Sequence, residues 1–179
     1  MITKLNNIYS KYEKMTAFPI QDYVKECHFV PTCCLVVKKS LFKKYGFFDD
    51  RFISSGDLEY GNRIYQRGVD INYFPQIKVF HPARSSLIQL LKKSFRIGRG
   101  IQQLYKYYPN RFSDTKRNIL SLRYFLPYKP WLYSKHLSNN LIWCKASLIQ
   151  KSMFYFIGCL GKLFSHIGYI YEYLRNNHK

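Results

Sequence analysis

The chain has 179 residues, of which 47% are hydrophobic, so it is long and apolar enough for a folded core, and this excludes an intrinsically disordered chain. Its 29 Lys and Arg residues against 10 Asp and Glu residues give a formal net charge of +19. Such an excess favours nucleic acid, an anionic membrane surface or a phosphate-bearing substrate as a partner. The five cysteines form no CxxC pair, which argues against a zinc site and indicates reduced thiols in a cytosolic setting.

Residues 1–24 are predicted to be a leader that contains a short helix. The chain opens with the polar run MITKLNNIYSKYEK, which lacks the apolar segment that a secretory signal requires. Eight of the 10 acidic residues precede Arg84, so the remainder of the chain is basic throughout.

Short strands and helices are predicted to alternate between residues 28 and 80. The apolar, β-branched run 28–37 predicts a buried strand, and two shorter strands are expected on either side of Pro75, at 71–74 and 78–80. Two helices with a capping residue and a terminal glycine are predicted between them: 40–45 with Ser40 and Gly46, and 58–67 with Ser55 or Asp57 and Gly68.

Two longer helices are predicted in the basic part of the chain. Apolar residues recur at helical spacing over 86–107 and again over 145–174, and a basic, aromatic connector at 109–130 separates them. Lys162 interrupts the apolar run of the last helix, so we expect a helix that lies along a membrane interface rather than one that spans the bilayer. The alternative is an amphipathic helix that packs on its own domain.

Five sequence patterns occur in order between His28 and Gly100: TCCLVVKKSLF, YGFFDDRF, SGDLEYGNRIYQRG, VFHPAR and FRIGRG. Together they resemble the second half of the catalytic domain of bacterial family 2 glycosyltransferases, which are inverting enzymes with a GT-A fold. The resemblance implies an α/β fold, namely an incomplete GT-A domain followed by a helical, membrane-associated C-terminal region. It divides the chain into the leader at 1–24, the acceptor-side half at 25–105, a basic aromatic connector at 106–145 and an amphipathic membrane-interface helix at 146–179.

The chain departs from the family pattern in two ways. Cys34 stands where the family has Asn, and the front half with its nucleotide-binding strands and DxD motif has no counterpart in the sequence. We therefore expect a split or truncated gene, or a separate chain that carries the N-terminal half. The divalent metal of the complete enzyme, Mg or Mn, would then be held largely by residues of that half.

Asp57 is the predicted catalytic base. In inverting transfer, a carboxylate takes the proton from the acceptor hydroxyl, and a helix N-terminus keeps such a carboxylate ionised. The alternative is that Asp57 only caps the helix. Glu59 is expected to bind the acceptor or to pair with Arg63, four residues on, and Arg63 to support Asp57 or to make that pair.

Phosphate and metal roles are predicted for four further residues. In the family, the position of His81 lies near the diphosphate and contributes to the metal site, but a capping role is the equal alternative. Diphosphate binding is predicted for Arg84, Arg96 and Arg99, because the guanidinium fork suits phosphate oxygens. Gly98 and Gly100, beside the last two, would let a chain or a ligand approach closely, and the alternative is a solvated basic face.

The resemblance predicts transfer of a sugar from a nucleotide sugar to a cell-surface glycan or a lipid-linked acceptor. The expected location is peripheral, at an anionic membrane surface on the cytoplasmic face of the bacterial inner membrane. Two other functions stay open: a non-catalytic membrane-bound partner of another transferase, and a basic nucleic-acid-binding module. No recognised nucleic-acid-binding motif accompanies the charge, so we expect no nucleic acid partner.

Overall fold

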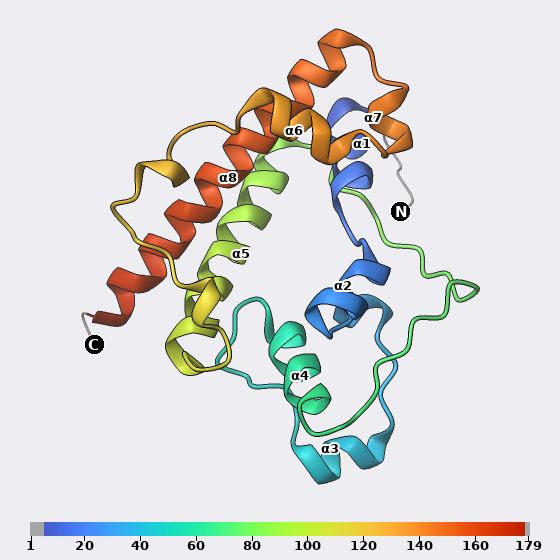
Figure 1. Ribbon diagram of the computed structural model, residues 1–179, viewed down its shortest axis with the longest axis vertical. Coiled ribbons are helices and arrows are strands. Elements are labelled where there is room, and N and C mark those ends of the chain that lie inside the picture. The colour runs from blue at the N-terminus through green and yellow to red at the C-terminus, as the bar shows by residue number, and fades with distance from the viewer. Residues whose placement is uncertain (1–5, 178–179) are drawn as a thin grey trace. The chain divides into compact units, whose positions relative to one another are not determined.

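The computed structural model describes residues 6–177, and its regular elements are helices (Figure 1). Their contacts group the chain into two compact units, which are described separately below. One unit contains the residues up to Ala17 together with those from Pro82 onward, and the other is Phe18–His81. The domain boundaries inferred from the sequence stay predictions.

The first unit contains the two long helices, the N-terminal helix and the connector. Its α-helices are α1 (Ile8–Thr16), α5 (Leu87–Tyr107), α6 (Pro130–Leu137), α7 (Leu141–Cys144) and α8 (Leu148–Asn177). Two 3-10 turns interrupt the connector, η2 (Ser113–Thr115) and η3 (Leu122–Tyr124). Helix α5 begins after Ser86, whose side chain accepts a hydrogen bond from the amide of Gln89. The helical predictions for 86–107 and 145–174 are therefore confirmed, with ends that shift by a few residues.

Helices α5 and α8 run side by side along most of their length (Figure 1). A Cβ atom added to Gly98 would lie 1.8 Å from the carbonyl oxygen of Ser165, and one added to Gly168 would lie 2.1 Å from the carbonyl oxygen of Phe95. No side chain fits in such spaces, so the two backbones touch at both glycines. The close approach expected at Gly98 is confirmed, and the chain that approaches is α8.

The start of α8 closes a second part of the same core. Met15 of α1, Leu137 of α6 and Trp143 of α7 pack with Phe154 of α8 in one buried cluster. Tyr133 donates its hydroxyl hydrogen to the carbonyl oxygen of Phe154 at 2.9 Å. The polar leader therefore supplies a core helix to this unit, which its composition alone did not indicate.

The second unit contains the helices α2 (Ile20–Cys27), α3 (Lys39–Tyr45) and α4 (Gly56–Tyr65) and the 3-10 turn η1 (Thr32–Cys34). Tyr60 of α4 is fully buried, and Phe42 and Phe48 pack on its ring. The predicted helices at 40–45 and 58–67 are confirmed as α3 and α4. Gly46 follows α3 with a φ of 83°, the left-handed conformation that favours glycine.

The predicted α/β fold is wrong for this chain. No strand forms in the described part of the segments 28–37, 71–74 and 78–80, where the backbone instead makes turns and irregular extended stretches. A strand obtains its backbone hydrogen bonds from a neighbouring strand, and none of these three segments has a neighbouring strand among residues 6–177. Pro31 and Pro75 also lack the amide hydrogen that a paired strand donates. Apolar side chains of these stretches are left exposed, from Val36 at 92% to Phe80 at 72%.

Candidate functional site

Asp57 lies in the first turn of α4. Ser55, with a φ of 67°, turns the chain into the helix, and its own side chain makes no capping hydrogen bond. The Asp57 carboxylate instead accepts hydrogen bonds from two amides, that of Leu58 at 3.0 Å and that of Thr32 at 3.3 Å. Asp57 is also partly exposed, and the free amides of the helix start suit an ionised carboxylate that reaches solvent. Its role as base stays a prediction.

Glu59 and Arg63 form a buried ion pair inside the second unit. The Glu59 side chain has 0% exposure, and its Oε1 lies 3.0 Å from the Nε of Arg63. Arg63 also donates to the carbonyl oxygens of Tyr45 and Phe47, the latter at 2.6 Å. The pair therefore fastens the end of α3 and the turn after it to α4. The alternative prediction, an ion pair between Glu59 and Arg63, is confirmed. Acceptor binding by these residues stays a prediction.

His81 lies at the end of the second unit, where its ring meets the ring of Phe18 edge-on at 5.1 Å. Among the residues that the structure describes, no group of three or more His, Cys, Asp or Glu side chains is placed to hold a metal ion. Metal binding by His81 stays a prediction, and residues 6–177 do not place a complete set of ligands beside it.

The three arginines predicted to bind a diphosphate are not gathered at one point. Arg84 pairs with the buried Glu13 at 2.7 Å, and Arg99 pairs with Glu172 at 2.6 Å. Both ion pairs join helices, α1 to the start of α5 and α5 to α8. Arg96 is exposed on α5. Diphosphate binding by these arginines stays a prediction. In the structure, Arg84 and Arg99 each form an ion pair that stabilises the packing of the first unit.

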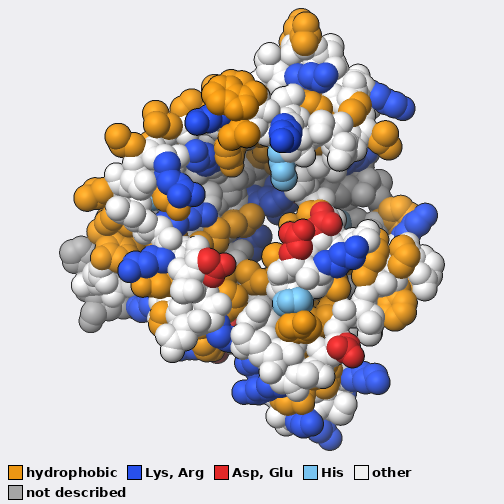
Figure 2. Space-filling view, in the orientation of Figure 1, with side chains coloured by type: hydrophobic (Ala, Val, Ile, Leu, Met, Phe, Trp, Pro, Cys, Tyr) orange, Lys and Arg blue, Asp and Glu red, His pale blue; other side chains and the backbone are white. Residues whose placement is uncertain are grey.

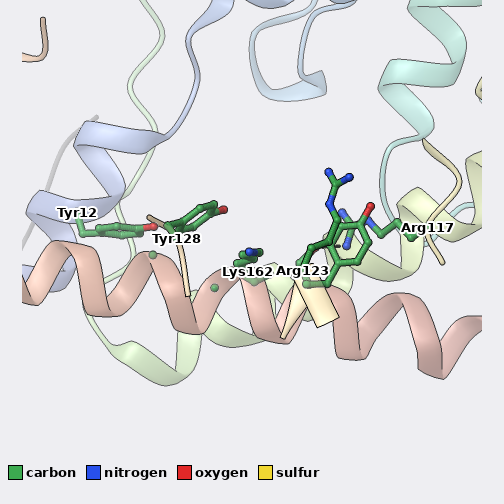
Figure 3. Close-up of a pocket in the computed structure, with 10 residues that line it drawn as sticks. Tyr12, Arg117, Arg123, Tyr128 and Lys162 are labelled. Carbon is green, nitrogen blue, oxygen red and sulfur yellow. Dashed lines mark hydrogen bonds between the residues drawn. The ribbon is translucent and has the colours of Figure 1, made fainter. Parts of the chain in front are cut away.

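Three cationic side chains line a pocket of the first unit. The pocket has a volume of about 430 Å³, and it is lined by Tyr12, Ser94, Arg117, Arg123, Tyr124, Tyr128, Gly158, Gly161, Lys162 and Ser165. Figure 3 shows Tyr12 and Tyr128 toward one end, Arg123 and Arg117 toward the other, and Lys162 between them. Lys and Arg side chains also dominate the charged surface in Figure 2, where acidic ones are few.

The pocket cations are held by neutral groups. Arg117 donates from Nη1 to the hydroxyl of Ser165 at 3.3 Å, and its guanidinium lies 5.3 Å from the centroid of the Tyr124 ring. Lys162 donates to the carbonyl oxygen of Leu126 at 2.9 Å. Burial, followed by smaller effects that include the positive charge of Arg123, lowers the pKa of both Lys162 and Arg117.

The sequence predictions missed this pocket, although two signals pointed toward it. The stretch around Arg117 and Arg123, which is predicted as part of the basic, aromatic connector, is rich in tyrosine and nearly free of acids. Gly158 and Gly161 occur about one turn apart in α8, and both line the pocket, where an added Cβ atom would meet Tyr133 and Ser94, respectively. Only the fold brings the connector and α8 together.

Comparison with known proteins identifies a relative. The chain is similar to the glycosyltransferase AglE of Haloferax volcanii, with 26% identity over 147 residues. The match covers 80% of this chain and 46% of AglE, so the chain spans about half the length of this curated relative. No family model and no solved structure matches it. Similarity to a glycosyltransferase is thus confirmed, whereas the assignment to bacterial family 2 stays a prediction.

Helix α8 is long and apolar enough to cross a membrane when judged by length and composition alone. A core helix of a soluble protein passes the same test, and one face of α8 does pack on α5. This is weak evidence for membrane association and none for a particular face of the membrane. The predicted peripheral, interfacial position is therefore carried forward as a proposal.

Proposed function

We propose that this chain supplies the acceptor-side part of a membrane-associated family 2 glycosyltransferase. The observation that carries the proposal is the similarity to AglE, which covers 80% of this chain. The proposed reaction transfers a sugar from a nucleotide sugar to a cell-surface glycan or a lipid-linked acceptor, at the cytoplasmic face of the membrane. Nucleotide-binding residues and a DxD motif would come from outside this sequence, on the same polypeptide or on a separate chain.

Asp57 is the proposed base. Its carboxylate takes the proton from the acceptor hydroxyl while the acceptor oxygen bonds to the anomeric carbon and the bond to the nucleoside diphosphate breaks. Two amide hydrogen bonds, at 3.0 and 3.3 Å, hold the carboxylate in one orientation. A bound Mg or Mn ion would neutralise charge on the departing diphosphate. His81 is the candidate ligand from this chain, and the remaining ligands would come from the nucleotide-binding part.

The test is complementation of a host strain that lacks the gene. Transfer of labelled sugar into glycan and lipid fractions is measured in membranes with the wild-type chain or the Asp57→Asn variant. We expect Asp57→Asn to lower transfer about 100-fold or more while the protein level stays unchanged, because general base catalysis contributes about that much. Asp50→Asn is the matched control, since Asp50 is exposed and precedes the helix.

The alternative function predicts a different result in the same experiment. A non-catalytic membrane-bound partner of another transferase would need the chain but not its carboxylate. Full transfer with Asp57→Asn, together with loss of transfer in the strain without the gene, would favour this alternative and contradict the catalytic assignment. Equal transfer with and without the gene would contradict both.

A further inference from the structure

The pocket between α8 and the connector has three cationic side chains and no acidic one among the described residues that line it. The first unit contains three acidic residues among its described positions: Glu13, Asp114 and Glu172. Glu13 pairs with Arg84 and Lys93, and Glu172 pairs with Arg99. Asp114 lies exposed in η2 and does not line the pocket. In the described part of the chain, then, Arg117, Arg123 and Lys162 share one pocket without a carboxylate partner.

Grouping three cations in this way is costly without an anion. Like charges repel, and a partly buried cation loses hydration that a tyrosine ring or a carbonyl oxygen only partly replaces. The lowered pKa values of Lys162 and Arg117 have the same origin, because burial makes the charged form of each side chain less favourable. An anion that enters the pocket would remove the repulsion and restore charge-assisted hydrogen bonds. Proteins keep such arrangements where an anion binds.

We propose that this pocket binds a phosphate or diphosphate group of a ligand. Phosphate carries the charge that the three cations lack, and it accepts hydrogen bonds in several directions from guanidinium and ammonium groups. The hydroxyls of Ser94 and Ser165 add two neutral donors at the wall. Gly161 keeps that wall open, because a Cβ atom there would lie 3.3 Å from the Ser94 hydroxyl oxygen.

The pocket is separate from the residues predicted to bind the diphosphate. None of Arg84, Arg96 and Arg99 lines it, and the connector, which supplies two of its cations, lies outside the region of family resemblance. The inference concerns binding only, so it holds whether or not the chain takes part in sugar transfer. Its failure and the failure of the proposed function are therefore distinguishable.

Two sources of the phosphate are tested with the purified full chain. One arm titrates inorganic pyrophosphate and uridine diphosphate by calorimetry. The other measures co-sedimentation with phosphatidylcholine vesicles that contain or lack phosphatidylglycerol. We expect at least one arm to give binding that weakens with salt and that weakens about 10- to 100-fold in Arg123→Gln and in Lys162→Gln, as for loss of one charge-assisted hydrogen bond.

The controls separate the pocket from general charge and from misfolding. Lys92→Gln removes one positive charge from an exposed position on α5 that does not line the pocket, and it should bind like the wild type. Arg123 is exposed, so Arg123→Gln keeps the test valid if Lys162→Gln does not fold. A folded wild-type chain that binds none of the probes would overturn the proposal. So would equal weakening in Lys92→Gln and Arg123→Gln, which is the signature of non-specific attraction.

Discussion

Different internal contacts stabilise each of the two units of the molecule. In the first unit, α5 and α8 meet backbone to backbone at two glycines, and the ion pairs of Glu13 and Glu172 join α1 and α8 to α5. In the second unit, one buried ion pair and the aromatic rings around Tyr60 hold α3 and α4. Long stretches on either side of that centre have no regular structure. The difference shows that helices close their own hydrogen bonds, whereas the predicted strands depend on neighbours that residues 6–177 do not supply.

Replacing Gly98 with Val should have the largest effect, because it breaks the contact on which the first unit depends. The added Cβ would overlap the Ser165 carbonyl oxygen, so α5 and α8 must separate. We expect the free energy of unfolding to fall by more than about 4 kcal/mol, beyond ordinary overpacking. Chemical unfolding and hydrogen exchange in α5 and α8 measure the loss.

Gly161→Ala is the control for that change. It adds a methyl group to the same helix pair, but the nearest atom is the flexible Ser94 hydroxyl at 3.3 Å, and alanine favours the helix more than glycine. Its stability should stay close to that of the wild type. If Gly98→Val were equally stable, the two helices would not pack as described.

The second unit should break at its ion pair. Arg63→Leu removes the guanidinium that pairs with the buried Glu59 and frees the carbonyl oxygens of Tyr45 and Phe47. We expect a loss of about 3 kcal/mol, the usual cost of breaking a buried ion pair by removing one member. Chemical denaturation and hydrogen exchange of α4 amides provide the measurement. Arg67→Leu removes an exposed charge near the same helix end and should cost much less.

A double variant shows whether loss of the ion pair is the cause. Glu59→Leu with Arg63→Leu removes both charges, so it should recover part of the stability lost in Arg63→Leu. Equal stability of the single and double variants would mean that the hydrogen bonds to Tyr45 and Phe47, and not the ion pair, hold α4 in place.

The same contrast explains what could be predicted from the sequence. Helices α4 and α5 follow local signals, such as Ser86 before α5 and apolar residues at helical spacing within it. The segments 28–37 and 71–80 carry equally clear strand signals, but a strand is not decided by its own residues alone. The pocket could not be predicted from local sequence patterns either, because Arg117 and Lys162 come from different elements that only tertiary packing brings together. The position of Asp57 at the start of a helix could be predicted because its turn and helix are consecutive in the sequence, whereas its role as base stays a prediction.

The outer face of α8 carries apolar side chains that the described residues leave exposed. The extended stretches of the second unit share this property. The pocket residues Gly158, Lys162 and Ser165 lie on one face of α8, and exposed apolar residues lie on the opposite face by helical spacing. That outer stripe consists of Ile149, Met153, Phe156, Ile167 and Leu174, and it is bordered by Tyr171, whose ring lies 5.5 Å from that of Phe95 on α5. Because the inner face of α8 packs on α5, removing the whole helix would disrupt the core and would not test membrane binding. Point variants of the stripe are therefore required.

Phe156→Glu places a charge where the proposed interfacial helix would enter the bilayer, at a side chain that is 59% exposed. If α8 lies at the interface, vesicle binding should weaken about tenfold or more, since burial of a large apolar side chain contributes about 1.5–3 kcal/mol. Asn139→Glu adds the same charge at an exposed position in the turn after α6 and should bind nearly as the wild type does. Pyrophosphate binding in the pocket should be unchanged in both variants, because the stripe faces away from it. If Phe156→Glu bound vesicles as tightly as the wild type while remaining folded, the stripe would not be the membrane contact. The phosphatidylglycerol dependence of vesicle binding by Arg123→Gln would then show whether the pocket face contacts the membrane.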